Sequence, residues 1–219
     1  MKYRTVLFDL DGTLVDSAEL ILRSWRHTMR VHFGEAPPDE DWLETLGMPL
    51  RTQFRRWAGT PAEIQAMIDT YVEHNLREHP TWIRPFRGVR STLWGLTQKS
   101  VGLGIVTSKA KRGAAASLAA CGIDAGLFGT IVTSDEPVPH KPDPAPVRLA
   151  LERLGEKAER AVFVGDSIWD IRSGRDAGVA TAAALWGPFP ETTLSAEGPT
   201  HSLSHVTDLL DLAGGAPQV

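Results

Sequence analysis

YRTVLFDLDGTLVDS, residues 3–17, is the stretch that decides the fold. Its first six residues form a short apolar run that stops at Asp9, a pattern typical of a buried strand entering a functional loop. Asp9 and Asp11 are two positions apart, so both carboxylates face the same side of an extended chain. Gly12 then permits a sharp turn. Carboxylates this close repel each other unless a cation lies between them or one keeps its proton.

The periodicity of the sequence changes after this loop. Between residues 17 and 33 apolar side chains recur every three or four positions, which predicts an amphipathic helix. Three more helices are expected, over residues 39–46, 50–57 and 61–78. Thr60 and Pro61 are a typical N-cap and first-turn residue for the last of them. Residues 16–84 are therefore predicted to be all-helical.

Strands and helices alternate from residue 85 onwards. Strands are expected over 101–106, 129–132, 160–164 and 179–184, the last being the final strand, and helices over 89–98, 111–120, 144–154 and 168–177. This alternation predicts right-handed crossovers and a parallel, doubly wound sheet. The fold class is thus α/β, with a Rossmann-like core domain (1–15 and 85–219) interrupted by an inserted helical domain (16–84).

The composition excludes several classes of protein. The net charge is −4 and the 23 Lys and Arg residues are scattered, so nucleic acid is not an expected partner. No apolar run reaches the roughly 18 residues of a membrane span, and the acidic residues within the first ten or so positions do not fit a signal peptide. Cys121 is the sole cysteine, which fits a reducing cytoplasm. We expect a cytoplasmic monomer or homodimer without a membrane partner.

Polar residues follow the predicted strands where ligands bind in doubly wound sheets. Thr107 and Ser108 end one strand and offer hydroxyl and backbone N–H donors to an anion. Lys141 stands among prolines just before a helix. These three residues predict an anion site, although Thr107 and Ser108 also suit a helix N-cap.

Two further carboxylates, Asp166 and Asp170, lie beyond the strand expected over 160–164. Hard oxygen ligands from Asp9 and Asp166 suit Mg²⁺, which also takes an oxygen from a substrate phosphate. Asp170 lies on a helix, where its ordinary alternative is an exposed or capping carboxylate. A lone Asp-X-Asp pair is weak evidence, because most are solvated loop residues.

Four motifs in this order and spacing, DLDGTLVDS, VTSK, KPDP and GDSIWD, resemble those of the haloacid dehalogenase-like hydrolases. The resemblance covers essentially the whole chain, including the helical insert, which forms a cap in that family. KPDPAPVRLALERLG and AGVATAAALWG look most like the branch of phosphoglycolate phosphatases and related inorganic pyrophosphatases.

The resemblance implies the catalytic roles. Asp9 would be the nucleophile that forms an aspartyl-phosphate, and Asp11 the general acid and base. Thr107 and Ser108 would hold the transferring phosphoryl group, while Lys141 would neutralise its charge. The residues alone do not assign the nucleophile.

The resemblance also implies a Mg²⁺ site. Its ligands would be the Asp9 carboxylate, the backbone carbonyl of Asp11 and Asp166. Asp170 would orient a ligand water or Lys141 from behind.

The cap is expected to select the substrate. In the family the segment around Leu46–Arg51 faces the active site, so Arg51 would recognise a second anionic group. The alternative is that Arg51, Arg55 and Arg56 form a solvated helix face. Trp169 lies inside the fourth motif, where it could border the active site. No chemical role is predicted for Trp169 or for His140, which lies beside the third motif.

The function expected from this resemblance is a phosphatase for a small phosphorylated metabolite, with phosphoglycolate as first candidate. Inorganic pyrophosphate and a sugar phosphate, as in the β-phosphoglucomutases, are the alternatives. Those mutases usually carry Glu where this chain has Gly165. Asp11 argues against a dehalogenase or a transport ATPase, and the full set of catalytic positions argues against a non-enzymatic regulatory scaffold.

Overall fold

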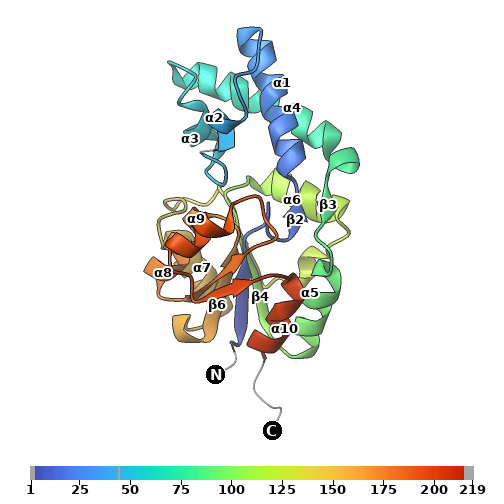
Figure 1. Ribbon diagram of the computed structural model, residues 1–219, viewed down its shortest axis with the longest axis vertical. Coiled ribbons are helices and arrows are strands. Elements are labelled where there is room, and N and C mark those ends of the chain that lie inside the picture. The colour runs from blue at the N-terminus through green and yellow to red at the C-terminus, as the bar shows by residue number, and fades with distance from the viewer. Residues whose placement is uncertain (1–2, 44, 215–219) are drawn as a thin grey trace.

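A parallel sheet of six strands, ordered β5-β4-β1-β6-β7-β8, lies at the centre of the core domain (Figure 1). The computed structural model describes residues 3–43 and 45–214. The strands are β1 (Thr5–Phe8), β4 (Gly102–Val106), β5 (Thr130–Val132), β6 (Ala161–Gly165), β7 (Ala180–Ala184) and β8 (His201–Leu203). Neighbouring strands all pair in parallel. The predicted α/β fold is confirmed.

Helices cover both faces of this sheet because its central strand is apolar on both sides. Val6 and Phe8 of β1 are buried in one apolar cluster and Leu7 in another, since side chains alternate along a strand. The helices of the core domain are α5 (Val89–Gln98), α6 (Lys111–Ala120), α7 (Ala145–Leu154), α8 (Ile168–Ala177), α9 (Glu191–Ala196) and α10 (Leu209–Leu212). Helices α5, α6 and α10 pack in the first cluster and α7 in the second.

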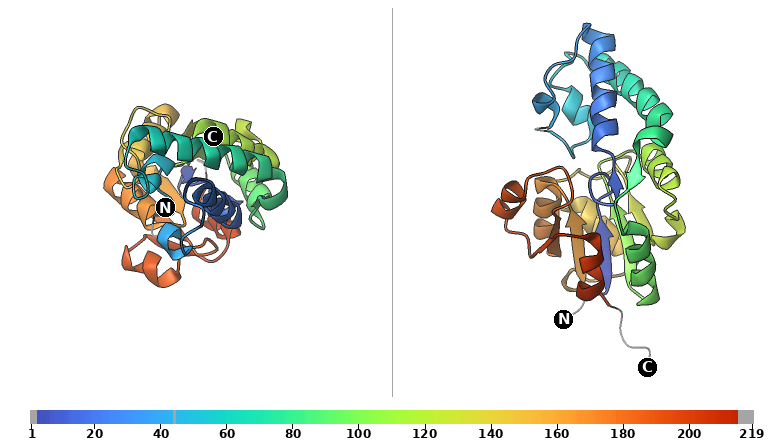
Figure 2. Two further views of the ribbon diagram at one scale, coloured as in Figure 1. Left: turned by 90° about the horizontal axis from the view of Figure 1, so that it is seen from above. Right: turned by 45° about the vertical axis from the view of Figure 1, so that its right-hand side comes forward.

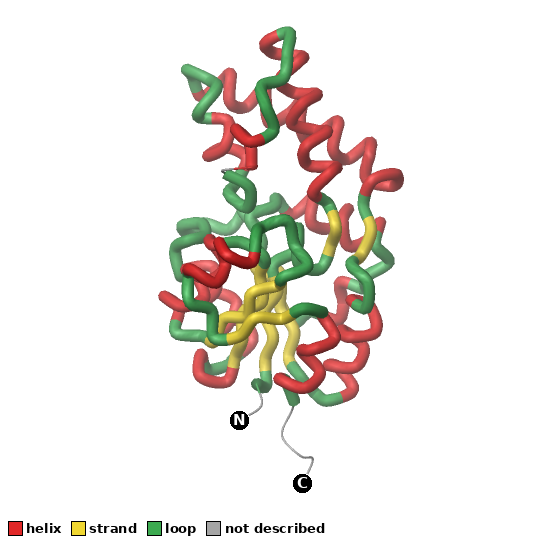
Figure 3. The backbone as a smooth tube through the Cα atoms, viewed as in Figure 1, coloured by secondary structure: helices red, strands yellow, loops and turns green. Residues whose placement is uncertain are grey.

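The helical cap lies beyond the carboxyl ends of the strands (Figure 2). Its helices are α1 (Ala18–Phe33), α2 (Glu40–Leu43), α3 (Leu50–Phe54) and α4 (Pro61–Trp82). Two short antiparallel strands, β2 (Val15–Asp16) and β3 (Arg84–Pro85), carry the chain into and out of the cap (Figure 3). The domain boundaries predicted at 15/16 and 84/85 fall within this pair of strands.

The cap has an aromatic core of its own. The rings of Trp25 and Trp42 stack with centroids 5.7 Å apart, and Trp42 also stacks on Tyr71 at 6.0 Å. Phe54 packs against both Trp42 and Tyr71. Aromatic pairs of this kind contribute about 0.5–1.5 kcal/mol beyond the burial of their surface. These rings come from α1, α2, α3 and α4, so one cluster joins all four cap helices.

Two cap helices are shorter than predicted. The helix expected over 39–46 covers only Glu40–Leu43, and residue 44 lies outside the described residues. Gly47 has a φ of +90°, which is incompatible with a right-handed helix, and Pro49 disfavours helical backbone in the residue before it. The helix expected over 50–57 ends at Phe54.

Two other predictions are wrong: the position at which helix α4 ends, and the identity of the last strand. The helix expected to stop at residue 78 continues through Pro80 to Trp82, although the proline removes one helical hydrogen bond. Trp82 at its end packs beneath the Arg23 guanidinium, whose Cζ lies 3.5 Å from the centroid of the ring. Residues 179–184 do not form the final strand, since β8 pairs with β7. β8 has three residues, too few to show an alternating pattern.

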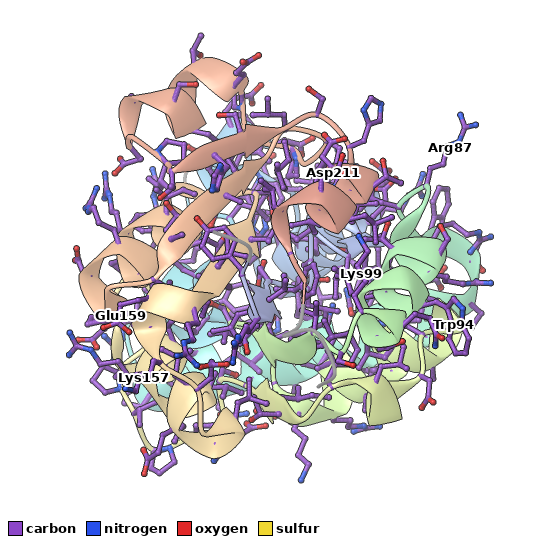
Figure 4. The ribbon with its side chains drawn as sticks, turned by 90° about the horizontal axis from the view of Figure 1, so that it is seen from below. Arg87, Trp94, Lys99, Lys157, Glu159 and Asp211 are labelled. Atoms are coloured by element: carbon purple, nitrogen blue, oxygen red, sulfur yellow. The ribbon has the colours of Figure 1, made fainter. Side chains whose placement is uncertain are left out.

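The end of the core domain away from the cap presents exposed side chains (Figure 4). The labelled residues Arg87, Trp94, Lys99, Lys157, Glu159 and Asp211 are all exposed. Lys99 donates a hydrogen bond to the Leu210 carbonyl and so joins α5 to α10. Within residues 3–43 and 45–214, no helix combines the length and the apolar character needed to cross a membrane.

Candidate active site

The predicted site residues meet where β4, β1 and β6 end beneath the cap (Figure 1). Asp9 follows β1, Thr107 follows β4 and Asp166 follows β6. These strands are parallel neighbours, so their carboxyl ends lie at the same edge of the sheet. Residues far apart in sequence are thereby brought to one point.

Lys141 lies at the floor of the site and is only 4% exposed. Its Nζ donates to Asp9 Oδ1 at 2.8 Å, to Asp170 Oδ1 at 2.6 Å and to the Val106 carbonyl at 3.2 Å. Burial by itself lowers the pKa of Lys141, but the charges of Asp170 and Asp9 outweigh it and raise that pKa. The ammonium is therefore kept charged.

Asp9 and Asp166 are buried carboxylates with raised pKa values. Burial raises the pKa of Asp9 to about 7, although Lys141 opposes the rise. Burial, followed by repulsion from Asp170 and Asp9, raises the pKa of Asp166 well above its usual value. One buried ammonium serves three buried carboxylates here, so Lys141 alone cannot offset their charge when all three are ionised.

This excess charge fits a divalent cation. Oxygens of Asp9, Asp166 and Asp170 all lie within 4.8 Å of one another. Asp170, however, already accepts from Lys141 on Oδ1 and from the Ser167 N–H (3.0 Å) and hydroxyl on Oδ2. Asp9 Oδ2 and Asp166 Oδ2 accept no hydrogen bond from the described residues, which leaves these hard oxygens for Mg²⁺.

Gly12 allows the Asp11 loop to approach Asp166. Its φ is +83°, and a Cβ at this position would lie 2.3 Å from Asp166 Oδ2. Thr13, on the same turn, donates its hydroxyl to Asp166 Oδ1 at 2.9 Å. The turn therefore both orients Asp166 and leaves room for it.

The Asp11 side chain is held by residues for which no role was predicted. Ser17 Oγ donates to Asp11 Oδ1 at 2.7 Å, and Lys109 Nζ donates to Oδ1 at 2.8 Å and to Oδ2 at 3.1 Å. Both partners lie inside the motifs DLDGTLVDS and VTSK, which is the only signal that the sequence carries for them.

The strand end after β4 offers an unused donor. Thr107 Oγ1 accepts from the Lys109 backbone N–H at 3.2 Å. The Ser108 hydroxyl is buried and has no hydrogen-bond partner among the described residues. An unpartnered buried hydroxyl costs stability, and this one is available to donate a hydrogen bond at the cavity that Ser108 lines.

A cavity of about 340 Å³ separates these core residues from the cap. Arg51 lines it and donates to Gln65 Oε1 at 2.6 Å. His140 also lines the cavity, whereas Arg55 does not. Trp169 is not part of the lining; instead, its Nε1 donates to the Leu46 carbonyl of the cap at 2.9 Å.

Comparison with known proteins agrees with this geometry. Residues 6–184 match the family of haloacid dehalogenase-like hydrolases. The chain belongs to this family. The Pyrophosphatase PpaX of Halalkalibacterium halodurans is 36% identical over 214 residues, which cover 98% of each chain. That of Bacillus velezensis is 39% identical over 214 residues and 97% of each chain.

The fold of this haloacid dehalogenase-like hydrolase also occurs in solved structures. The crystal structure of a predicted phosphoglycolate phosphatase from Haemophilus somnus has a TM-score of 0.86 and 24% sequence identity, covering 96% of this chain and 98% of that one. At this identity the likeness shows a shared fold. The match over residues 6–184 and the relatives above 30% identity confirm the family predicted from the four motifs.

Proposed function

We propose that this chain is a Mg²⁺-dependent phosphatase that acts through an aspartyl-phosphate on Asp9 and prefers inorganic pyrophosphate. The observation that carries the proposal is the meeting of Asp9, Lys141 and Asp166 at the carboxyl edge of the sheet, where Asp9 and Asp166 line the cavity under the cap. A buried ammonium beside hard carboxylate oxygens meets the needs of a phosphoryl group and a divalent cation together.

In the first step the Asp9 carboxylate attacks the phosphorus atom. The bond from phosphorus to the leaving oxygen breaks, and protonated Asp11 gives its proton to that oxygen. Lys141, bonded to Asp9 Oδ1, keeps the nucleophile in place and offsets the charge of the arriving phosphoryl group. Ser108 has a hydroxyl free to donate to a phosphoryl oxygen.

In the second step a water molecule hydrolyses the aspartyl-phosphate. Asp11, now ionised, takes a proton from the water as its oxygen bonds to phosphorus. The bond between phosphorus and Asp9 breaks and phosphate leaves. Asp11 ends the cycle protonated, as it began it.

The residues that would hold Mg²⁺ are Asp9 and Asp166, with the backbone carbonyl of Asp11 added by the family resemblance. When bound, the ion supplies positive charge that offsets the repulsion between the carboxylates and the phosphate. Both oxygens of Asp170 already accept hydrogen bonds, Oδ1 from Lys141 and Oδ2 from the Ser167 N–H. Asp170 therefore orients Lys141 and is not counted among the ligands of the ion.

Pyrophosphate is favoured because its leaving group is a small anion. Arg51, Lys109 and Arg112 all line the cavity and bring positive charge to the space beyond Asp9. The curated relatives named as pyrophosphatases match along nearly their whole length. Phosphoglycolate, whose leaving group carries a carboxylate, fits the same three cations and is the second candidate.

A sugar phosphomutase is less well supported. A Cβ on Gly165 would lie 2.3 Å from the Asp170 Cβ, so this backbone has no room for the Glu expected in the mutases. Replacing Gly165 would also displace Asp170 from Lys141.

The test is a steady-state screen with Mg²⁺ and four substrates: pyrophosphate, phosphoglycolate, glycerol 2-phosphate and glucose 1-phosphate. We expect the highest kcat/KM for pyrophosphate, no turnover in excess chelator, and no turnover by Asp9→Asn. Asp11→Asn should lose at least about 10²-fold in kcat, as is typical of general acid–base groups. Near-normal kcat in Asp9→Asn would rule out the covalent route.

A further inference from the structure

Lys109 and Asp11 form a sheltered ion pair at the edge of the cavity. Lys109 Nζ lies 2.8 Å from Asp11 Oδ1 and 3.1 Å from Oδ2. The two side chains are only 14% and 19% exposed. Salt screens such partly buried pairs much less than surface pairs, so added salt should weaken this contact only slightly.

This contact competes with the chemistry assigned to Asp11. Lys109 donates to both oxygens of Asp11, and Ser17 also donates to Oδ1, so neither oxygen is free to approach a leaving oxygen while these contacts stand. Asp11 must nevertheless give a proton to the leaving oxygen in the proposed first step. The pair therefore has to separate in each cycle, and a sheltered Lys109 without any anionic partner would be costly.

The helix beside Lys109 leaves a path for its side chain. Gly113 lies in the first turns of α6, and a Cβ there would be 3.1 Å from Lys109 Cε and 3.2 Å from Cγ. Glycine inside a helix costs about 1 kcal/mol relative to alanine, and the next three residues of α6 are alanines. The glycine thus accommodates the stem of Lys109 in the position that reaches Asp11.

We propose that Lys109 is a positioning residue that makes the acid–base step depend on the charge of the leaving group. An anionic group on the leaving half of the substrate takes the place of Asp11 on Lys109, and Asp11 is then free to turn toward the leaving oxygen. The exchange breaks no covalent bond. It rests on the proposed function, in which Asp11 is the acid and base.

The substitution Lys109→Met separates this role from simple charge support. Its kcat/KM for pyrophosphate should fall by about tenfold or more, as expected for a lost charge-assisted contact. Its kcat for glycerol 2-phosphate, which has an uncharged leaving group, should rise several-fold, because Asp11 no longer has to leave Lys109 without a replacement. Lys111→Met, which removes an exposed lysine outside the cavity lining, should follow the wild type on both substrates.

Gly113→Ala provides an independent test. Alanine favours the helix, so the melting temperature should stay the same or rise, while the preference for pyrophosphate over glycerol 2-phosphate should fall. Equal losses on both substrates in Lys109→Met, or a wild-type preference in either variant, would overturn the inference. A wild-type protein inactive on every phosphate ester and on pyrophosphate would overturn the proposed function, and this inference with it.

Discussion

Trp169 Nε1 lies 2.9 Å from the carbonyl oxygen of Leu46, so a side chain on core helix α8 donates a hydrogen bond to the cap segment between α2 and α3. This segment borders the cavity. A Cβ on neighbouring Gly47 would lie 3.0 Å from Trp169 Cδ1, which shows how closely the cap approaches the indole. The contact joins the cap to the core at the helix that follows β6, the strand beside β1 and Asp9.

We predict that Trp169→Phe weakens cap closure. Losing a hydrogen bond worth about 1 kcal/mol should lower kcat/KM for pyrophosphate by roughly fivefold, because closure excludes water from the reaction. Subtilisin should also cut the segment 45–49 faster. Trp94→Phe, at an indole that is 62% exposed at the far end of the core (Figure 4), is the matched control. Unchanged kinetics and cleavage in Trp169→Phe would show that the bond does not hold the cap.

Asp166→Asn should trade activity for stability. Asp166 is buried among other carboxylates, and burial followed by their repulsion raises its pKa. In excess chelator the amide removes this repulsion and keeps an acceptor for Thr13, so the melting temperature should rise by roughly 2–4 °C for each kcal/mol gained. Added Mg²⁺ should stabilise the wild type more than the variant, which should be inactive.

The measurement is thermal unfolding with chelator and with Mg²⁺. Asp176→Asn, at an exposed carboxylate on the same helix, controls for loss of charge alone. An Asp166→Asn variant less stable than the wild type in chelator would contradict the excess of negative charge.

His79 joins cap helix α4 to core helix α6 and should make stability depend on pH. It is 2% exposed, with Nδ1 2.6 Å from the Asn75 carbonyl and Nε2 3.1 Å from Ser117 Oγ. Burial lowers its pKa below the usual 6.5, and Lys109 adds to this while the Asn75 carbonyl opposes it. Below about pH 6.5 the unfolded chain takes up a proton before the folded one does, so stability falls as the pH drops from there toward the lowered pKa.

His79→Gln should therefore lose roughly 1 kcal/mol at pH 7.5, from a weakened hydrogen bond, yet show a smaller further loss at pH 5.5. Urea unfolding at the two pH values measures both quantities. His32→Gln, at an exposed histidine of the cap, should keep the wild-type dependence on pH. If His79→Gln and the wild type lose the same stability between the two pH values, His79 is not the titrating group.

The sequence predicts the floor of the site well because residue type and strand position are both visible in it. Asp9, Thr107 and Asp166 each follow a short apolar run, and parallel strands must end at the same edge. Lys141 has no strand of its own, and the motif resemblance supplied its role. The structure brings all four together at one edge of the sheet.

Contacts made by long side chains could not be predicted in the same way. Lys109 has several rotatable bonds, and its stem passes close to Gly113 of α6 on the way to Asp11. Short elements such as β8 are likewise determined by their neighbour in the sheet rather than by their own pattern. Local periodicity therefore identifies the core, whereas tertiary packing decides these details.

Under the proposed function, Arg51 is the cap residue expected to contact the leaving group. It lines the cavity from α3, and its Nη2 is bonded to Gln65, whose Nε2 in turn donates to Asp69 at 2.9 Å. This chain of amide and carboxylate contacts directs the guanidinium along the cap without neutralising it directly. Arg55 is exposed on the same segment and does not line the cavity.

Arg51→Ala should raise KM for pyrophosphate and phosphoglycolate by about tenfold with little change in kcat, because the guanidinium binds the leaving group in the ground state and the transition state alike. An aryl phosphate such as p-nitrophenyl phosphate has no second anion, so KM and kcat for it should change little in Arg51→Ala. Arg51→Lys should recover only part of the loss, since an ammonium lacks the planar fork that grips two oxygens. Arg55→Ala should match the wild type throughout. Equal losses on all three substrates would instead make Arg51 a structural residue of the cap, acting through Gln65 rather than on the substrate.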